Sequence, residues 1–218
     1  HLPTKSAVAY DFPVLLGLLR PLQAAAASVL DLGGSVGVHY YAYRRYIPMP
    51  VALTWQVVEV PTMVAVGRNL AKSSAATALS FTEDMDQAMT ASGSDIWISA
   101  GAMQYMEGVR PARLLERCVV RPKHILLNKL PLYPGDDFVT TQNLGAGSFT
   151  PVQVFNRRRY LQEIEACGYM LWDKWDVPER SLYVPGCPER SIPSFSGLYF
   201  VDTQQLPNSA TPPPYKGL

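Results

Sequence analysis

The chain has 218 residues and a formal net charge of +1, and 48% of its residues are hydrophobic. This length suits one α/β domain with a sizeable core. Because the basic residues are dispersed along the chain, nucleic acid is not expected as a partner. No apolar stretch reaches the roughly 18 residues that cross a bilayer, and the nearest candidate, 12–28, is interrupted by Arg20, Pro21 and Gln23. We therefore expect no membrane segment.

The cysteines predict a reducing environment. Cys118, Cys167 and Cys187 are odd in number and show no C-x-x-C spacing, so they fit free thiols better than a disulfide framework or a zinc site. Residues 12–28 also lack a basic leader region and a cleavage site. We therefore expect a cytoplasmic protein without a signal peptide.

The first expected element is a helix that follows Asp11. Asp11 can act as the N-cap, Pro13 suits the first turn, and five leucines between residues 15 and 22 supply an apolar face. This helix should pack on the sheet just before the first strand.

The stretch 29–37 reads Val-Leu-Asp-Leu-Gly-Gly-Ser-Val-Gly. Val29, Leu30 and Leu32 predict a buried central strand, and the glycines predict a tight turn into a helix over 38–46. Strand, turn and helix N-terminus would form a crevice in which backbone N–H groups face a small ligand.

The glycine spacing bears on the ligand class. A dinucleotide fingerprint, G-x-G-x-x-G, fits poorly because Ser35 and Val38 fall where its second and third glycines belong. The spacing Asp31-x-Gly33-x-Ser35-x-Gly37 instead resembles motif I of class I S-adenosylmethionine-dependent methyltransferases. In that family the loop packs against the methionine half of the cofactor, where no pyrophosphate has to be cradled. A glycine-rich turn of this kind also occurs in other α/β proteins, so the motif alone leaves both interpretations open.

Two further strands are expected after the glycine turn. The stretch 54–58 predicts a strand that ends at Glu59, about twenty residues after the turn, where a carboxylate can accept both ribose hydroxyls of an adenosyl group. A helix over 62–71 and a strand over 77–81 follow. By the resemblance, the polar residues after that strand lie near the adenine ring; they are Thr82, Glu83 and Asp84.

The next part of the chain continues the alternation of strands and helices. A strand over 95–99, a polar segment over 101–106, a helix over 111–118 and a strand over 124–128 are expected. This alternation, with polar residues gathered at one end of the strands, predicts a doubly wound sheet.

The pattern changes after residue 128. Residues 129–155 are rich in proline and glycine, with only a short β-like piece at 138–141, and residues 178–193 form a second proline-containing excursion. Both are expected to be lids or substrate-side insertions. A helix over 157–167, strands over 169–175 and 196–201, and a loose tail over 203–218 complete the chain, so that 1–202 is expected to form one domain.

A narrower resemblance covers residues 10–201. It is to a family of bacterial methyltransferases often encoded among polysaccharide or O-antigen biosynthesis genes. The chain departs from it at Asn128-Lys129-Leu130-Pro131, where the family carries a more acidic Asp-Arg-Thr-Pro type of sequence. The shared segments are Tyr10-Asp11-Phe12-Pro13, 30–37, the tyrosine-rich helix after it, Trp55-Gln56-Val57-Val58-Glu59, 99–107, Thr141-Gln142 and 196–200.

The resemblance implies a class I methyltransferase fold, an α/β fold with a central, mostly parallel seven-stranded sheet and helices on both faces. It also implies S-adenosylmethionine as the cofactor and, as acceptor, a small polar molecule such as a sugar or nucleotide-sugar hydroxyl. The cofactor-binding residues expected are Asp31, Gly33, Gly34, Ser35, Gly37, Glu59, Thr82, Glu83, Asp84, Ser99, Ala100 and Gln104.

Methyl transfer to a hydroxyl needs a general base in addition to alignment of donor and acceptor. His39 follows the glycine turn and is the leading candidate, with a structural role at a helix start as the alternative. Tyr105 is a second candidate in the acceptor pocket. No metal is expected, because Ser99 and Asn128 stand where magnesium-dependent O-methyltransferases gather carboxylates. Lys129, Arg157 or Arg158 are candidates for holding a phosphate or carboxylate of the substrate.

Two other functions stay open on the sequence. One is a non-catalytic α/β module that binds an adenosyl ligand without a methyl acceptor. The other is a nucleotide-dependent oxidoreductase. Titration with S-adenosylmethionine and NAD(P) separates the oxidoreductase from the other two, and only methyl transfer to an acceptor separates the enzyme from the module.

Overall fold

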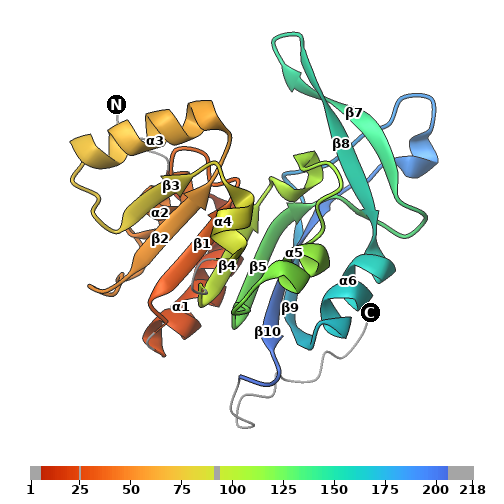
Figure 1. Cartoon of the computed structure of the whole chain (residues 1–218). Coiled ribbons are helices and arrows are strands. Elements are labelled where there is room, and N and C mark those ends of the chain that lie inside the picture. The colour runs from red at the N-terminus through yellow and green to blue at the C-terminus, as the bar shows by residue number, and fades with distance from the viewer. Residues whose placement is uncertain (1–5, 25, 91–93, 206–218) are drawn as a thin grey trace.

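The structure is a computed structural model that describes residues 6–24, 26–90 and 94–205. Its centre is a seven-stranded sheet (Figure 1). In spatial order the strands are β3 (Leu79–Thr82), β2 (Thr54–Val58), β1 (Ser28–Leu32), β4 (Ile96–Ala100), β5 (His124–Leu130), β10 (Phe195–Asp202) and β9 (Tyr169–Val177).

The strand directions confirm the predicted fold class. The strands from β3 to β5 run parallel, and β10 is antiparallel to both of its neighbours. The chain winds outward from β1 to β3 and then returns to place β4 on the other side of β1. Ligands of open α/β sheets bind at such a reversal, beyond the carboxyl ends of the strands.

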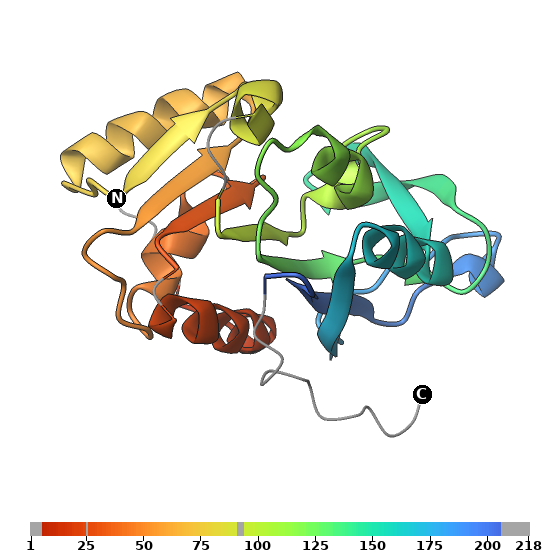
Figure 2. The same cartoon turned by 60° about the horizontal axis from the view of Figure 1, so that its bottom comes forward.

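Helices cover both faces of the sheet, each through an apolar face that joins one of two cores. α1 (Phe12–Gln23), α2 (Val38–Tyr43) and α3 (Pro61–Ser73) contribute to the core on one face. α4 (Met85–Thr90), α5 (Pro111–Arg117) and α6 (Arg157–Ala166) contribute to the core on the other. Figure 2 shows α1 and α5 on opposite sides of the strands.

Several predicted boundaries differ from the structure. The helix expected over 38–46 ends at Tyr43, the third strand begins at Leu79 rather than residue 77, and α4 was not expected. The signal for α4 was present, because Asp84 and Gln87 have the spacing of a capping box, and Asp84 Oδ1 accepts a hydrogen bond from Gln87 N (2.8 Å).

Asp95 lies just before β4, at the amino edge of the sheet, and ties the starts of the strands together. Its Oδ2 accepts hydrogen bonds from Ala27 N (2.9 Å), Ser28 N (3.2 Å) and Ser28 Oγ (2.9 Å). Its Oδ1 pairs with Lys123 Nζ at 2.9 Å. Burial acts to raise the pKa of Asp95, but these bonds and the nearby ammonium outweigh it, so the pKa lies below its usual value.

The expectation of an irregular segment over 129–155 was wrong. β7 (Phe138–Gly145) and β8 (Ser148–Asn156) form an antiparallel hairpin that rises from the carboxyl edge of the sheet (Figure 1). Together with β6 (Leu132–Tyr133) they make a three-stranded sheet. Ala146 and Gly147 connect the hairpin with φ of 49° and 76°, the two positive values of a type I′ turn.

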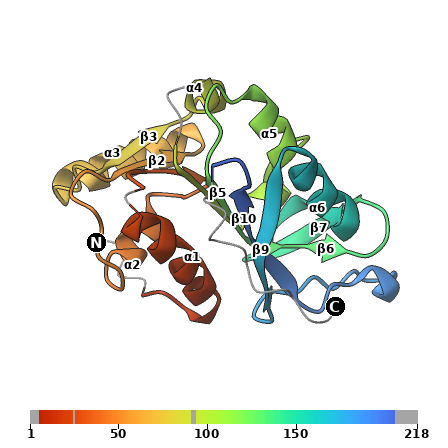
Figure 3. The same ribbon diagram turned by 90° about the horizontal axis from the view of Figure 1, so that it is seen from below.

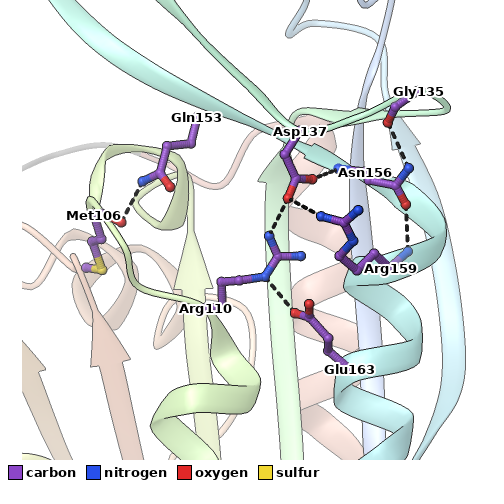
Figure 4. A network of polar contacts seen from close by, with 8 residues as sticks. All are labelled: Met106, Arg110, Gly135, Asp137, Gln153, Asn156, Arg159 and Glu163. Atoms are coloured by element: carbon purple, nitrogen blue, oxygen red, sulfur yellow. Dashed lines mark hydrogen bonds and ion pairs between the residues drawn. The ribbon is translucent and has the colours of Figure 1, made fainter.

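Ion pairs hold the base of the hairpin against the main domain (Figure 4). Arg110 donates from Nε to Glu163 Oε2 (2.6 Å) and from Nη1 to Asp137 Oδ2 (3.0 Å). Asp137 also accepts from Asn156 N, and Gln153 Nε2 donates to Met106 O (2.6 Å). Most of these contacts join segments far apart in the sequence, so local patterns could not predict where the hairpin is anchored.

The excursion over 178–193 packs on the hairpin. It contains a 3-10 turn (Pro188–Arg190) and a bridge between Leu182 and Ile192. Leu182 and Ile192 form a third small core with Val152 and Val154 of β8. Most of the predicted tail, 206–218, lies outside the described residues. Within the described ranges, no helix is long and apolar enough to span a membrane, and the three cysteines are unpaired.

Candidate cofactor and acceptor site

The turn between β1 and α2 needs its glycines for two reasons. Gly33 and Gly37 have φ of 71° and 87°, which L side chains rarely adopt. A Cβ at Gly33 would lie 2.1 Å from Ala102 Cβ, and one at Gly37 would lie 2.7 Å from Leu79 Cδ2. The turn therefore fits closely against a side chain of β3 and against the segment that follows β4.

Gly34 lies on top of the Asp31 carboxylate, where an added Cβ would come within 2.4 Å of Asp31 Oδ2. Asp31 is fully buried, and its carboxylate accepts hydrogen bonds from His39 Nδ1 (3.0 Å) and Trp55 Nε1 (3.2 Å). The structure thus places Asp31 beneath the turn, as a support for His39.

Glu59 follows β2 and faces the turn. Its Oε1 accepts a hydrogen bond from Ser35 N and its Oε2 one from Val60 N, both at 2.9 Å. An ionised carboxylate has about four acceptor positions, so Glu59 keeps capacity for further donors while it orders the turn. Ser35 has φ of 53°, which aims its N–H at this carboxylate.

The residues at the end of β3 have different surroundings. Thr82 is buried and its carbonyl accepts from Glu59 N (3.0 Å), so the structure brings these two predicted residues together. Thr82 Oγ1 accepts from Asp84 N (3.1 Å), and Asp84 caps α4. Glu83 is exposed. Thr82 is therefore the member of this group held directly beside Glu59.

The residues at the end of β4 and just after it differ in whether their hydrogen-bonding groups already have partners within the chain. Ser99 is fully buried, and its Oγ donates to Leu32 O (3.1 Å), which ties β4 to β1. Ala100 is the buried last residue of β4. Gln104 is 3% exposed, and its Oε1 has no hydrogen-bond partner among the described residues. A buried acceptor without a partner costs free energy, so Gln104 is suited to a donor from outside the chain.

His39 lines a small cavity of about 60 Å³ together with Tyr10 and Lys129. A proton on Nδ1 satisfies the contact with Asp31, which leaves Nε2 as the acceptor of the imidazole. The fixed ring orientation and the free acceptor nitrogen are what a general base needs.

The N-terminal segment 6–11 closes this cavity, and this wall was not predicted. Asn128 is fully buried and donates from Nδ2 to Tyr10 O (2.8 Å). Tyr43 OH donates to Asp11 Oδ1 (3.2 Å), and burial followed by the Asp11 charge raises the pKa of Tyr43 well above its usual value. Asn128 thus positions the segment that covers His39.

Tyr105 contacts the β7–β8 hairpin. Its side chain is in a 3-10 turn (Met103–Tyr105), is 40% exposed and donates from OH to Gln142 Oε1 (2.8 Å) of β7. The structure therefore assigns its hydroxyl to the hairpin. Across the described ranges, no cluster of three or more histidines, cysteines, aspartates and glutamates is arranged to hold a metal ion.

The residues at this edge fit S-adenosylmethionine. Its ribose diol can donate to a carboxylate such as Glu59, and its ammonium group can donate to an unpartnered amide oxygen such as Gln104 Oε1. The chemistry of the donor and acceptor groups is thus complementary.

Known structures share this fold. No protein-family model and no curated protein sequence matches the chain. An S-adenosylmethionine-dependent methyltransferase from Mesorhizobium loti is similar, with a TM-score of 0.58 and 16% identity over 88% of this chain and 98% of the other. CalS10, an amino pentose methyltransferase from Micromonospora echinaspora, gives 0.53 and 14% over 90% and 92%. The [4+2]-cyclase SpnF gives 0.53 and 16% over 85% and 81%. The chain therefore has the fold of class I methyltransferases.

Proposed function

We propose that the chain is an S-adenosylmethionine-dependent methyltransferase that acts on a hydroxyl of a small polar acceptor, a sugar or nucleotide sugar. The observation that carries the proposal is the Asp31–His39 pair directly beneath a glycine turn at the reversal point of the sheet. A cofactor crevice and a candidate base meet there. Fold neighbours include methyltransferases, among them an amino pentose methyltransferase.

The cofactor would be held by three kinds of contact. Glu59 accepts the ribose hydroxyls, Gln104 accepts from the ammonium group, and the turn 33–37 packs against the methionine half. When bound, the cofactor supplies a methyl group on a positively charged sulfur. The chain's own contribution is to align that methyl with the acceptor and exclude water.

His39 then takes the proton of the acceptor hydroxyl on Nε2. The buried Asp31 carboxylate holds the Nδ1–H tautomer and stabilises the imidazolium that forms. The cavity beside His39, about 60 Å³, admits water but not a sugar ring. The segment 6–11 therefore has to move when an acceptor enters.

Two alternatives remain distinct from this proposal. SpnF, a [4+2]-cyclase, has the same fold, so the fold does not fix the reaction. A module that binds the adenosyl ligand without transferring its methyl group would use the same crevice. Neither alternative requires a base, which His39 and Asp31 provide.

Cofactor binding is tested by calorimetry on Glu59→Ala. Loss of charged hydrogen bonds to the ribose should weaken S-adenosylmethionine by about ten- to a hundredfold. Glu116→Ala, an exposed carboxylate on α5, serves as the matched control and should bind as wild type. Unchanged affinity in Glu59→Ala at an unchanged Tm would remove Glu59 from the site.

Methyl transfer is tested by a screen of nucleotide sugars and saccharides with labelled cofactor, read as the mass gain of one methyl group. His39→Asn keeps a side-chain donor to Asp31 but has no basic nitrogen, so turnover should fall by about a hundredfold or more with the cofactor Kd unchanged. Tight cofactor binding without any acceptor would favour the binding module. Labelling of protein or nucleic acid alone would contradict the small acceptor.

A further inference from the structure

A large groove lies where β9 ends and β10 begins. Its lining comes from both faces of the sheet, because Leu198 belongs to the core that α6 joins whereas Trp175 packs against the core that α1 joins. Its volume is about 890 Å³, within the range of small-molecule sites, roughly 300 to 1,000 Å³. β6, the first turn of α6 and the segment 189–194 form its walls. Figure 3 shows β6, β9 and α6 together, at the opposite side of the molecule from β2 and β3.

Two partly buried aromatic side chains, Tyr133 and Trp175, line the groove, and the polar tip of each is already hydrogen-bonded. Tyr133 OH already donates to Glu189 O (3.1 Å), and Trp175 Nε1 already donates to Asn128 Oδ1 (3.1 Å). Gly197 lies directly against the Trp175 indole, where an added Cβ would come within 1.9 Å of Cε2. The indole is therefore held in place by its polar tip and by the strand beside it.

The charged groups that line the groove balance. Arg157 and Lys174 contribute two positive charges, and Asp176 and Glu189 contribute two negative ones. Burial lowers the pKa of Lys174, and the charge of Arg157 lowers it further, whereas Asp176 acts in the opposite direction. The charges of Arg157 and Asp176 thus act on Lys174, and the four charged groups give the groove no net charge.

Three serine hydroxyls, from Ser191, Ser194 and Ser196, add to this lining. Aromatic and aliphatic surfaces interrupted by carboxylates, cations and hydroxyls suit a ligand with apolar C–H faces and many hydroxyl groups. A strongly anionic ligand would need an excess of positive charge, and a purely apolar ligand would remove water from the charged groups without replacing its hydrogen bonds.

We propose that this groove binds an uncharged saccharide, with its rings against Tyr133 and Trp175 and its hydroxyl groups on Asp176 and Glu189. β10 is three strands away from β1 in the sheet, or roughly 14 Å at the usual strand spacing. The ring in the groove is thus not the one that reacts. Resting on the proposed function, the groove holds the distal part of a glycan whose reacting end lies at His39.

The proposal is tested on the full chain without cofactor, using maltotriose, cellotriose and lactose as probes and the indole N–H signals of the four tryptophans as the readout. The Trp175 signal should shift on titration, while those of Trp55 and Trp97 should not, because these residues are 0% and 3% exposed in the cores. The double variant Asp176→Asn, Glu189→Gln should weaken binding by about tenfold or more. Both side chains are exposed, so folding should be retained.

Glu165→Gln, on the exposed side of α6 and outside the groove, is the matched control and should bind the probes as wild type. Absence of a Trp175 shift with all three saccharides, or equal binding by the double variant, would overturn the proposal. A shift with glucose 1-phosphate but none with neutral sugars would replace it by an anion site. Cofactor affinity measured on the same groove variants separates this result from the proposed function, since these variants should leave that affinity unchanged.

Discussion

The two edges of the parallel sheet contain the same kinds of side chain but use them differently. At the amino edge, Asp95 accepts from Ala27, Ser28 and Lys123, His124 Nδ1 is 2.9 Å from Tyr199 OH, and Tyr169 OH donates to Pro122 O (2.6 Å). Each of these polar groups has its partner inside the chain. The polar groups at the amino edge therefore stabilise the fold.

At the carboxyl edge, hydrogen-bonding capacity is left over. Gln104 Oε1 is buried without a partner among the described residues, Glu59 retains acceptor positions, and His39 is held through one ring nitrogen with the other available. Buried polar groups are normally satisfied, so the capacity left over at these three neighbours of the glycine turn and β4 indicates where a ligand completes the structure. The difference between the edges identifies the site more clearly than any single residue.

The largest expected effect comes from adding a methyl group at Gly33, where the turn contacts Ala102. Gly33→Ala introduces a Cβ close to Ala102 at a positive φ, so unfolding in urea should show a loss of about 3 kcal/mol. Adding Ala102→Gly should recover the steric part and leave about 1 kcal/mol from the backbone conformation. Without any recovery in the double variant, the close contact would not be the cause.

The free energy of unfolding should depend on pH through His124, the buried histidine at the amino edge. Burial, followed by the charges of Arg20 and Lys123, lowers the pKa of His124 from 6.5 to about 4, and Asp95 acts against this. The unfolded chain binds the proton more readily, so this stabilisation is present above pH 6.5 and is lost as the pH falls toward 4.

The loss should be on the order of 3 kcal/mol, measured by urea unfolding between these pH values. His124→Gln keeps a hydrogen-bonding group for Tyr199 and should remove the slope in this window. Asp95, whose pKa is lowered, destabilises only at lower pH. An unchanged slope in His124→Gln would assign the pH dependence elsewhere.

The sequence predicts the features that depend on local contacts better than those that depend on contacts between distant residues. The glycine turn, Glu59 and the alternation of strands and helices up to β5 depend on short segments with their own signals, and this alternation agrees with the structure. Asp84 and Gln87 have the capping-box spacing that indicates the start of α4, although α4 was not predicted. These features could be obtained from periodicity and spacing alone.

The segment that covers His39 and the anchoring of the hairpin depend on contacts between residues far apart in the sequence. Asn128 and Tyr10, which place the segment over His39, are 118 positions apart, and Arg110 reaches Glu163 across 53 positions. The hairpin has alternating burial and a two-residue turn, but proline and glycine in the same segment favoured a loop. Local sequence patterns do not predict which of these distant side chains are in contact.

Gln104→Met tests the unsatisfied acceptor directly. Replacing a buried oxygen that lacks a partner with an apolar group of similar size should leave stability unchanged or raise it by up to about 1 kcal/mol. Affinity for S-adenosylmethionine should fall by about tenfold. The measurements are urea unfolding and calorimetry, and a marked loss of stability with normal affinity would show that Gln104 serves the fold rather than the ligand.

The smallest expected effect concerns Tyr105, which joins the carboxyl edge to the hairpin. Tyr105→Phe removes the donor to Gln142, but the side chain is 40% exposed, so water replaces much of the lost bond and the local cost should be about 0.5 to 1 kcal/mol. Amides of β7 should exchange hydrogen about two- to fivefold faster, with global stability and cofactor affinity unchanged. Tyr183→Phe, at an exposed position on the 178–193 excursion, should leave exchange in β7 unchanged. If turnover were lost while the exchange of β7 stayed normal, Tyr105 would act on the acceptor itself, and the capacity left over at the carboxyl edge would include its hydroxyl.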